Sequence, residues 1–135
     1  MTSTAEQTKE GVIVIKVGQI LDLSLSNLNE GLITLANQPL RASVSFRLKG
    51  VFRQISEHFK SFNEARVELC EKLGTLNEKG TAYNLGENQE EFDKQLSELL
   101  VQDIEIQSKQ ISLFDLGDAQ LSVTQIEQIG WLISE

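Results

Sequence analysis

The chain has 135 residues, of which 40% are hydrophobic and 24% are charged, a composition typical of a single globular domain rather than of a disordered segment. Its 20 acidic and 12 basic residues give a net charge of −8, which argues against nucleic acid and anionic membranes as partners, because both attract proteins through lysine and arginine. The single cysteine excludes an internal disulfide bond, and the longest apolar run, Val12–Ile15, is far shorter than the roughly 20 residues of a membrane span.

The chain opens with a polar segment, Met1–Glu10, which we expect to be an extension (residues 1–10) ahead of a single α+β domain at residues 11–135. This segment lacks the apolar stretch of a secretory signal, so we expect synthesis in the cytoplasm. The next run, GVIVIKV at residues 11–17, is rich in β-branched side chains and is bounded by glycines. It predicts a strand.

A short helix is predicted next. Ser24 or Ser26 is placed to cap its start, and its end is predicted at Gln38, because the residue before Pro39 is disfavoured in the α conformation. Its apolar face consists of leucines at helical spacing: Leu25, Leu28, Leu32 and Leu35.

The longest predicted element is a helix at Arg41–Leu73, which contains neither proline nor a turn cluster. Gly74 is predicted to end it as a left-handed residue. A broad apolar stripe runs along it, formed by Val44, Leu48, Val51, Phe52, Ile55, Phe59, Phe62 and Leu69. Roughly 33 helical residues span about 50 Å, more than the diameter of a compact domain of this size. An unbroken helix therefore predicts an elongated molecule or one end left for a partner, and Gly50 is the position where a kink is expected.

Four further elements are predicted after the long helix: a hairpin turn at residues 77–80, a helix at 87–100, and short strands at 103–107 and 111–113. A capping box formed by Ser122 and Gln125 predicts a last helix that continues to Ile133. The sequence thus predicts an α+β fold with one long central helix and two or three shorter helices packed on a small β-sheet.

No catalytic, metal-binding or nucleotide-binding motif is recognisable in the chain, and no glycine-rich phosphate loop is present. His58, the only histidine, falls on the apolar side of the long helix and is interpreted as a packed residue, with a general base or pH switch as the alternative. Cys70 lies near the end of the same helix beside Glu68 and Glu71, where negative charge opposes thiolate formation. The sequence therefore predicts a non-enzymatic protein with no cofactor, no metal and no small-molecule substrate.

Charge is unevenly distributed along the chain. Residues 41–60 hold five basic side chains and one acid, whereas residues 87–105 hold seven acids and one base. The candidate contact residues are, on the basic side, Arg47, Lys49, Arg53 and Lys60 and, on the acidic side, Glu87, Glu90, Glu91 and Glu98. One interpretation is that these are solvated surfaces or pair within one molecule. The other is that they meet on neighbouring subunits, in which case the contact is head-to-tail and generates rings or filaments.

A further pattern combines a proline before the long helix, Phe-x-Glu-x-Arg near its end, a leucine and a Lys-x-Gly stop, at Pro39, Phe62, Glu64, Arg66, Leu69, Lys72 and Gly74. It continues with a phenylalanine-containing helix, a strand with alternating acids and a Leu-Ser pair, at Phe92, Glu98–Leu100, Asp103–Ile106 and Leu121-Ser122. The pattern resembles small uncharacterised proteins from the structural and assembly region of tailed bacteriophages and prophages. The likeness covers roughly residues 25–133, departs in the N-terminal extension and a shorter turn, and brings no catalytic residue with it.

The resemblance implies a virion structural or assembly protein of a tailed phage, at the head–tail junction, on the capsid as an accessory or cement protein, or in tail assembly. We expect it to contact other virion proteins or further copies of itself, as a homo-oligomer or within a larger assembly. Its expected location is the virion, after synthesis in the host cytoplasm. The alternative is a soluble phage-encoded protein that binds and inhibits a host protein, which predicts a stable monomer or dimer absent from purified particles.

Overall fold

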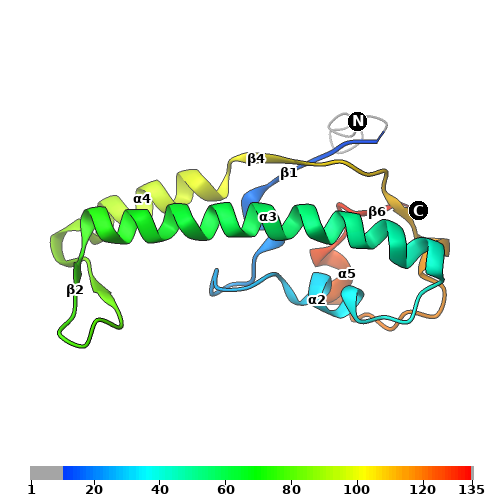
Figure 1. Cartoon of the computed structure of the whole chain (residues 1–135). Helices are drawn as coiled ribbons and strands as arrows, with labels where there is room; N and C mark the ends of the chain where they lie inside the picture. The colour runs from blue at the N-terminus through cyan, green and yellow to red at the C-terminus, as the bar shows by residue number, and fades with distance from the viewer. Residues whose placement is uncertain (1–10, 135) are drawn as a thin grey trace.

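The computed structural model describes residues 11–134, so the extension predicted at residues 1–10 lies outside the described residues. The fold is α+β with one long central helix, as predicted (Figure 1). Its helices are α2 (Glu30–Ala36), α3 (Ala42–Leu73), α4 (Gln89–Leu100) and α5 (Val123–Gln128), with the short 3₁₀ turns η1 (Val17–Ile20), η2 (Gly86–Asn88) and η3 (Leu113–Leu116). Its strands are β1 (Ile13–Lys16), β2 (Thr75–Leu76), β3 (Tyr83–Asn84), β4 (Asp103–Ile106), β5 (Ile111–Ser112) and β6 (Ile133–Ser134).

The long helix α3 continues through Gly50 without a break. The predicted apolar stripe is buried over its N-terminal two thirds, at Val44, Leu48, Val51, Ile55 and Phe62. The prediction that Gly74 ends the helix in a left-handed conformation is wrong: its φ is −127° and its ψ is 176°. Since strand β2 begins at the next residue, Gly74 is extended. A Cβ atom there would lie 3.0 Å from the main-chain oxygens of Cys70 and Asn84.

The start of α2 also differs from the prediction, because Asn29 caps the helix instead of Ser24 or Ser26. The side-chain oxygen of Asn29 accepts a hydrogen bond from the main-chain N–H of Leu32 at 2.8 Å. The two serines belong to the preceding turn, where the Ser24 hydroxyl donates to Asp22. This bond, aided by main-chain N–H groups of the turn, lowers the pKa of the Asp22 carboxyl. The helix is therefore shorter than the leucine spacing predicted.

The capping box of Ser122 and Gln125 is present at the start of α5, as predicted. The prediction that this helix continues to Ile133 is wrong, because α5 ends at Gln128 and Ile133 pairs with Ile111 between β6 and β5. The strands form three two-stranded sheets, of which β1–β4 and β2–β3 are antiparallel and β5–β6 is parallel.

The buried side chains are concentrated in one half of the molecule. Buried apolar residues lie between Ile13 and Phe62 and between Ile106 and Leu132, and no residue from 63 to 105 is buried. We call residues 63–102, namely the end of α3, the β2–β3 hairpin and α4, the arm, and the rest of the described chain the body. In Figure 1 α4 runs beside one half of α3, and the hairpin projects at that end. The molecule is therefore elongated, and one end has little core of its own.

Candidate functional site

Three of the four basic candidates share one exposed face of α3. Lys49, Arg53 and Lys60 are spaced by four and seven residues, which places them on the same side of a helix. All three are exposed, and within residues 11–134 none of them forms an ion pair. We call these three residues the basic face. Phe46, three residues before Lys49, adjoins it and is 78% exposed.

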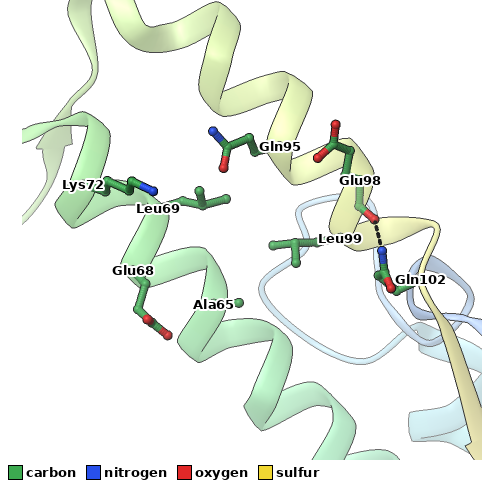
Figure 2. Close-up of a pocket in the computed structure, with 8 residues that line it drawn as sticks. All are labelled: Ala65, Glu68, Leu69, Lys72, Gln95, Glu98, Leu99 and Gln102. Atoms are coloured by element: carbon green, nitrogen blue, oxygen red, sulfur yellow. Dashed lines mark hydrogen bonds between the residues drawn. The ribbon is translucent and has the colours of Figure 1, made fainter.

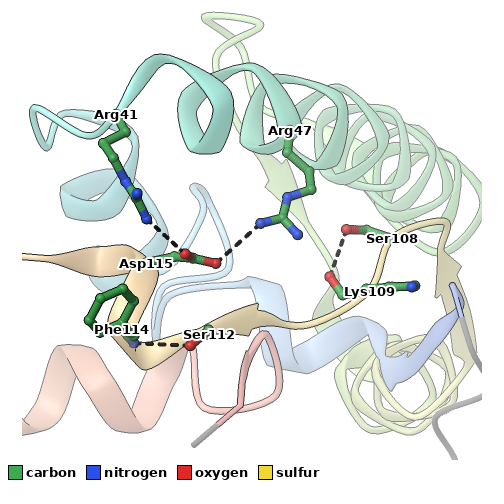
Figure 3. A network of polar contacts seen from close by, with 7 residues as sticks. All are labelled: Arg41, Arg47, Ser108, Lys109, Ser112, Phe114 and Asp115. Atoms are coloured by element: carbon green, nitrogen blue, oxygen red, sulfur yellow. Dashed lines mark hydrogen bonds and ion pairs between the residues drawn. The ribbon is translucent and has the colours of Figure 1, made fainter.

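The fourth basic candidate, Arg47, is held inside the molecule's own polar network (Figure 3). One oxygen of Asp115, in η3, accepts from Arg41 at 3.0 Å and the other accepts from Arg47 at 3.3 Å. The Asp115 side chain is only 23% exposed. Arg47 therefore pairs within its own molecule, as the first interpretation of the charged residues expects, and it does not belong to the basic face.

The acidic candidates all lie on the arm and are all exposed. Glu87 is in η2, Glu90 and Glu91 are in the first turn of α4, and Glu98 is in its last turns. The positive end of the helix dipole favours carboxylates in a first turn. Glu91 also accepts a hydrogen bond from Gln95 Nε2 at 2.6 Å. These positions give the arm an acidic surface along most of α4.

The basic face is separated along the molecule from three of the acidic candidates, Glu87, Glu90 and Glu91, whereas Glu98, in the last turns of α4, lies nearer to it. The side chain of Asn88, just before α4, donates to the main-chain oxygen of Leu73 at 2.7 Å, so the start of α4 lies at the end of α3. Roughly 20 helical residues from Arg53 to Leu73 correspond to about 30 Å. In the described part of the chain the ion pairs join Lys16 to Asp103 and the two arginines to Asp115. The two oppositely charged surfaces therefore do not neutralise each other within one chain.

A groove of about 350 Å³ lies between α3 and α4 on the arm (Figure 2). It is lined by Ala65, Glu68, Leu69 and Lys72 of α3, and by Gln95, Glu98, Leu99 and Gln102 of α4 and the residues after it. In Figure 2 the leucines lie between the two helices, and the carboxylates of Glu68 and Glu98 point away from the groove on opposite sides. The groove therefore has an apolar interior and a polar rim to which Glu68, Glu98 and Lys72 all belong.

Glu68 and Phe46 are the surface residues that sequence reasoning missed as candidate contacts. Phe46 is recognisable in the sequence as an apolar residue on the same helical side as Lys49 and Arg53, at offsets of three and seven. Glu68 is not recognisable in this way, because its nearness to Glu98 depends on how the hairpin returns α4 along α3. The groove is therefore a feature of the tertiary structure.

His58 and Cys70 occupy unremarkable positions. A ring nitrogen of His58 lies 3.1 Å from the main-chain oxygen of Glu105, which ties α3 to β4. Cys70 is a half-buried free thiol. Among residues 11–134, no three histidine, cysteine, aspartate or glutamate side chains are grouped so that they could hold a metal ion.

None of the helices in the described residues is both long enough and apolar enough to cross a membrane. Comparisons of the chain with protein-family models, with curated proteins and with solved structures found no match.

Proposed function

We propose that this chain is a non-enzymatic structural or assembly protein of a tailed phage particle, and that it binds further copies head to tail. The observation that carries the proposal is that the basic face, at residues 49–60 of the unbroken helix α3, forms no ion pair with the acidic arm in the described residues. The phage context rests on the sequence resemblance given above.

The separation of the two surfaces favours contact between molecules over contact within one. Arg53 and the carboxylates at the start of α4 lie about 30 Å apart and are screened from each other, because the Debye length is about 8–10 Å near physiological salt. A second copy that brings its arm to the basic face places opposite charges in direct contact. Such complementarity sets the partner and the orientation. Because the two surfaces differ, the contact is heterologous and repeats into a ring or a filament.

The exposed Phe46 beside the basic face supports the same proposal. Aromatic side chains near the centre of an interface commonly provide much of the binding energy. A phenylalanine that is 78% exposed gains apolar burial only when another molecule covers it. The basic face therefore has both the charge and the apolar anchor of a protein contact.

The mass of the purified protein in solution tests this proposal. Light scattering at about 50 mM and about 500 mM salt spans a range that screens exposed charge pairs. We expect an oligomer at low salt that dissociates at high salt. Reversal of two charges, Arg53→Glu with Lys60→Glu, is expected to weaken the oligomer without unfolding the domain. A monomer at both salt concentrations would overturn head-to-tail assembly.

The phage context has its own test, which is mass spectrometry of particles purified from the strain that encodes the chain. We expect the chain at a fixed ratio to the other virion proteins. A monomer that is absent from particles would instead favour the soluble inhibitor of a host protein, and the next experiment would be to isolate that host protein.

A further inference from the structure

We propose that the basic face of one copy packs on the outer side of the second half of α3 in the next copy, with the two helices parallel. The inference rests on the proposed head-to-tail assembly. It names the part of the arm that is contacted, which is α3 rather than α4, and the orientation of the two copies. It follows from a hollow on α3, from the exposed Phe46 and from the order of charges along the helix.

The hollow lies along the outer side of α3 and has a volume of about 610 Å³. Phe59 and Val67, two turns apart on one side of the helix, make its floor apolar. Val67 is 43% exposed, so a single copy leaves this apolar surface in contact with water. The lining residues in the described chain all belong to α3: Phe59, Lys60, Asn63, Glu64, Val67 and Glu68.

Three exposed carboxylates lie along the hollow and beyond it toward the end of α3, at Glu64, Glu68 and Glu71. In Figure 2 the Glu68 carboxylate points away from α4, toward the outside of the molecule. None of the three forms an ion pair within residues 11–134. Lys60 lies at the opposite end of the hollow, and Lys72 lines the α3–α4 groove. The outer side of α3 therefore keeps a net negative charge beyond the hollow.

The first half of α3 carries the matching features in the same order. Phe46, which is 78% exposed, is followed by Lys49 three residues later and by Arg53 seven residues later. These offsets place the three side chains on one side of the helix. Both cations are exposed and form no ion pair in the described residues. An aromatic side chain followed by two cations is thus the complement of an apolar hollow followed by carboxylates.

The order of charges favours parallel helices over antiparallel ones. When Phe46 of one copy enters the hollow of the next at the level of Asn63, parallel helices bring the two cations about one and two turns beyond it, within reach of Glu68 and Glu71. Antiparallel helices would bring the cations about one and two turns before it, onto the partner's own basic face at Lys60. Like charges that meet across a contact oppose binding. The contact is therefore head to tail.

The length of α3 suits this contact. The step from Phe46 to Asn63 is 17 residues, about 26 Å along the axis, which is roughly half of the 32-residue helix. The first half of each α3 therefore overlaps the second half of the next. Because the two halves of one helix engage two different neighbours, the same contact repeats along the assembly.

The experiment compares charge reversal on α3 with charge reversal on α4. The α3 variant carries Glu64→Lys and Glu68→Lys, and the matched control carries Glu90→Lys and Glu98→Lys, which changes the net charge equally. Analytical ultracentrifugation of the full chains at about 50 mM salt should show a dissociation constant at least about tenfold higher for the α3 variant, and less than about threefold higher for the control. The reverse result would overturn the inference and leave the proposed function standing. An unmodified protein that is a monomer at this salt would overturn both.

A mixture of two charge-reversed chains tests the contact by a gain of assembly. The Lys49→Glu/Arg53→Glu chain is acidic on both surfaces, and the Glu64→Lys/Glu68→Lys chain is basic on both. Each alone should be a monomer, whereas the 1:1 mixture should form species larger than dimers, which also shows that both chains are folded. A mixture that stays monomeric while the unmodified protein assembles would overturn the inference. A mixture that stops at 1:1 dimers would overturn the parallel orientation.

Discussion

A Cβ atom on Gly31 would lie 2.4 Å from the main-chain oxygen of Gln125, a separation that folded proteins do not contain. Helices α2 and α5 thus cross with their backbones almost in contact. The Gly31→Ala substitution is expected to destabilise the domain by about 1–3 kcal/mol, because the helices must move apart. Urea denaturation measures this directly, with the fluorescence of the single, buried Trp131 as the probe.

The matching substitution in α3 is expected to have the opposite sign. A Cβ atom on Gly50 would meet nothing within 4 Å, and alanine favours a helix interior over glycine by about 1 kcal/mol. Gly50→Ala should therefore stabilise the protein by up to that amount in the same denaturation experiment. A loss of stability would contradict the unbroken course of α3 at this point.

Asn29 is expected to be among the most sensitive polar positions. It is 2% exposed, and its amide group donates to the main-chain oxygens of Gln19 at 2.9 Å and Gln128 at 3.3 Å in addition to capping α2. Asn29→Ala removes the cap and leaves two partly buried acceptors without this donor, at a cost of about 2–4 kcal/mol. The matched control is Asn37→Ala at the exposed end of the same helix, which should change stability by less than about 1 kcal/mol.

The Asn29→Asp variant separates the two roles of this residue. Its carboxylate still accepts the bond from the main-chain N–H of Leu32, but it has no donor for the two carbonyl oxygens and buries a charge beside them. We expect a loss of stability comparable to that of Asn29→Ala. A stability equal to that of the unmodified protein would show that only the cap matters.

Tyr83 provides a prediction about pH. Desolvation of its hydroxyl, with smaller contributions from the charges of Glu71 and Cys70, raises the pKa of Tyr83 above its ordinary value of 10.0. Because the folded state holds the phenolic proton more tightly, the contribution of Tyr83 to stability is complete below pH 10 and is lost as the pH rises through the folded pKa. Since the chain has one tyrosine, ultraviolet absorbance follows this titration alone. Its midpoint should be higher in buffer than in denaturant, and Glu71→Gln should lower it.

Phe46→Ser tests the apolar part of the proposed contact. The side chain is 78% exposed, so its replacement should leave the denaturation midpoint nearly unchanged. The oligomer should nevertheless weaken in light scattering, because an aromatic anchor is lost. The exposed Leu23, in the loop before α2, serves as the control through Leu23→Ser. Equal assembly of the two variants would remove Phe46 from the contact.

The sequence was most informative where periodicity decides structure. The apolar stripe predicted both the length of α3 and the side that is buried. Apolar residues that repeat along one side of a helix are removed from water only when that side faces the core. Local signals were less reliable at the ends of helices. By residue type, Ser24 fits a helix N-cap and Gly74 fits a left-handed helix end. Ser24 instead belongs to the turn at Asp22, and Gly74 is extended because β2 begins at the next residue.

The candidate site was predictable in part for the same reason. Helical spacing alone placed Lys49, Arg53 and Lys60 on one face. The pairing of Arg47 with Asp115 joins residues 68 positions apart, and the groove requires the register between α3 and α4. Neither relationship is encoded in a local pattern, because both depend on how distant segments return to α3.

In the proposed head-to-tail assembly, the unbroken course of α3 would set the distance between one copy's basic face and its arm. Each residue of the helix advances the chain by about 1.5 Å and turns it by about 100°, so in such an assembly the number of residues between the basic face and the arm would fix both the spacing and the relative rotation of two successive copies. An insertion of one residue within this segment would rotate the groove by about 100° relative to the basic face. The curvature of a ring, or the twist of a filament, would thus depend on the length of a single helix.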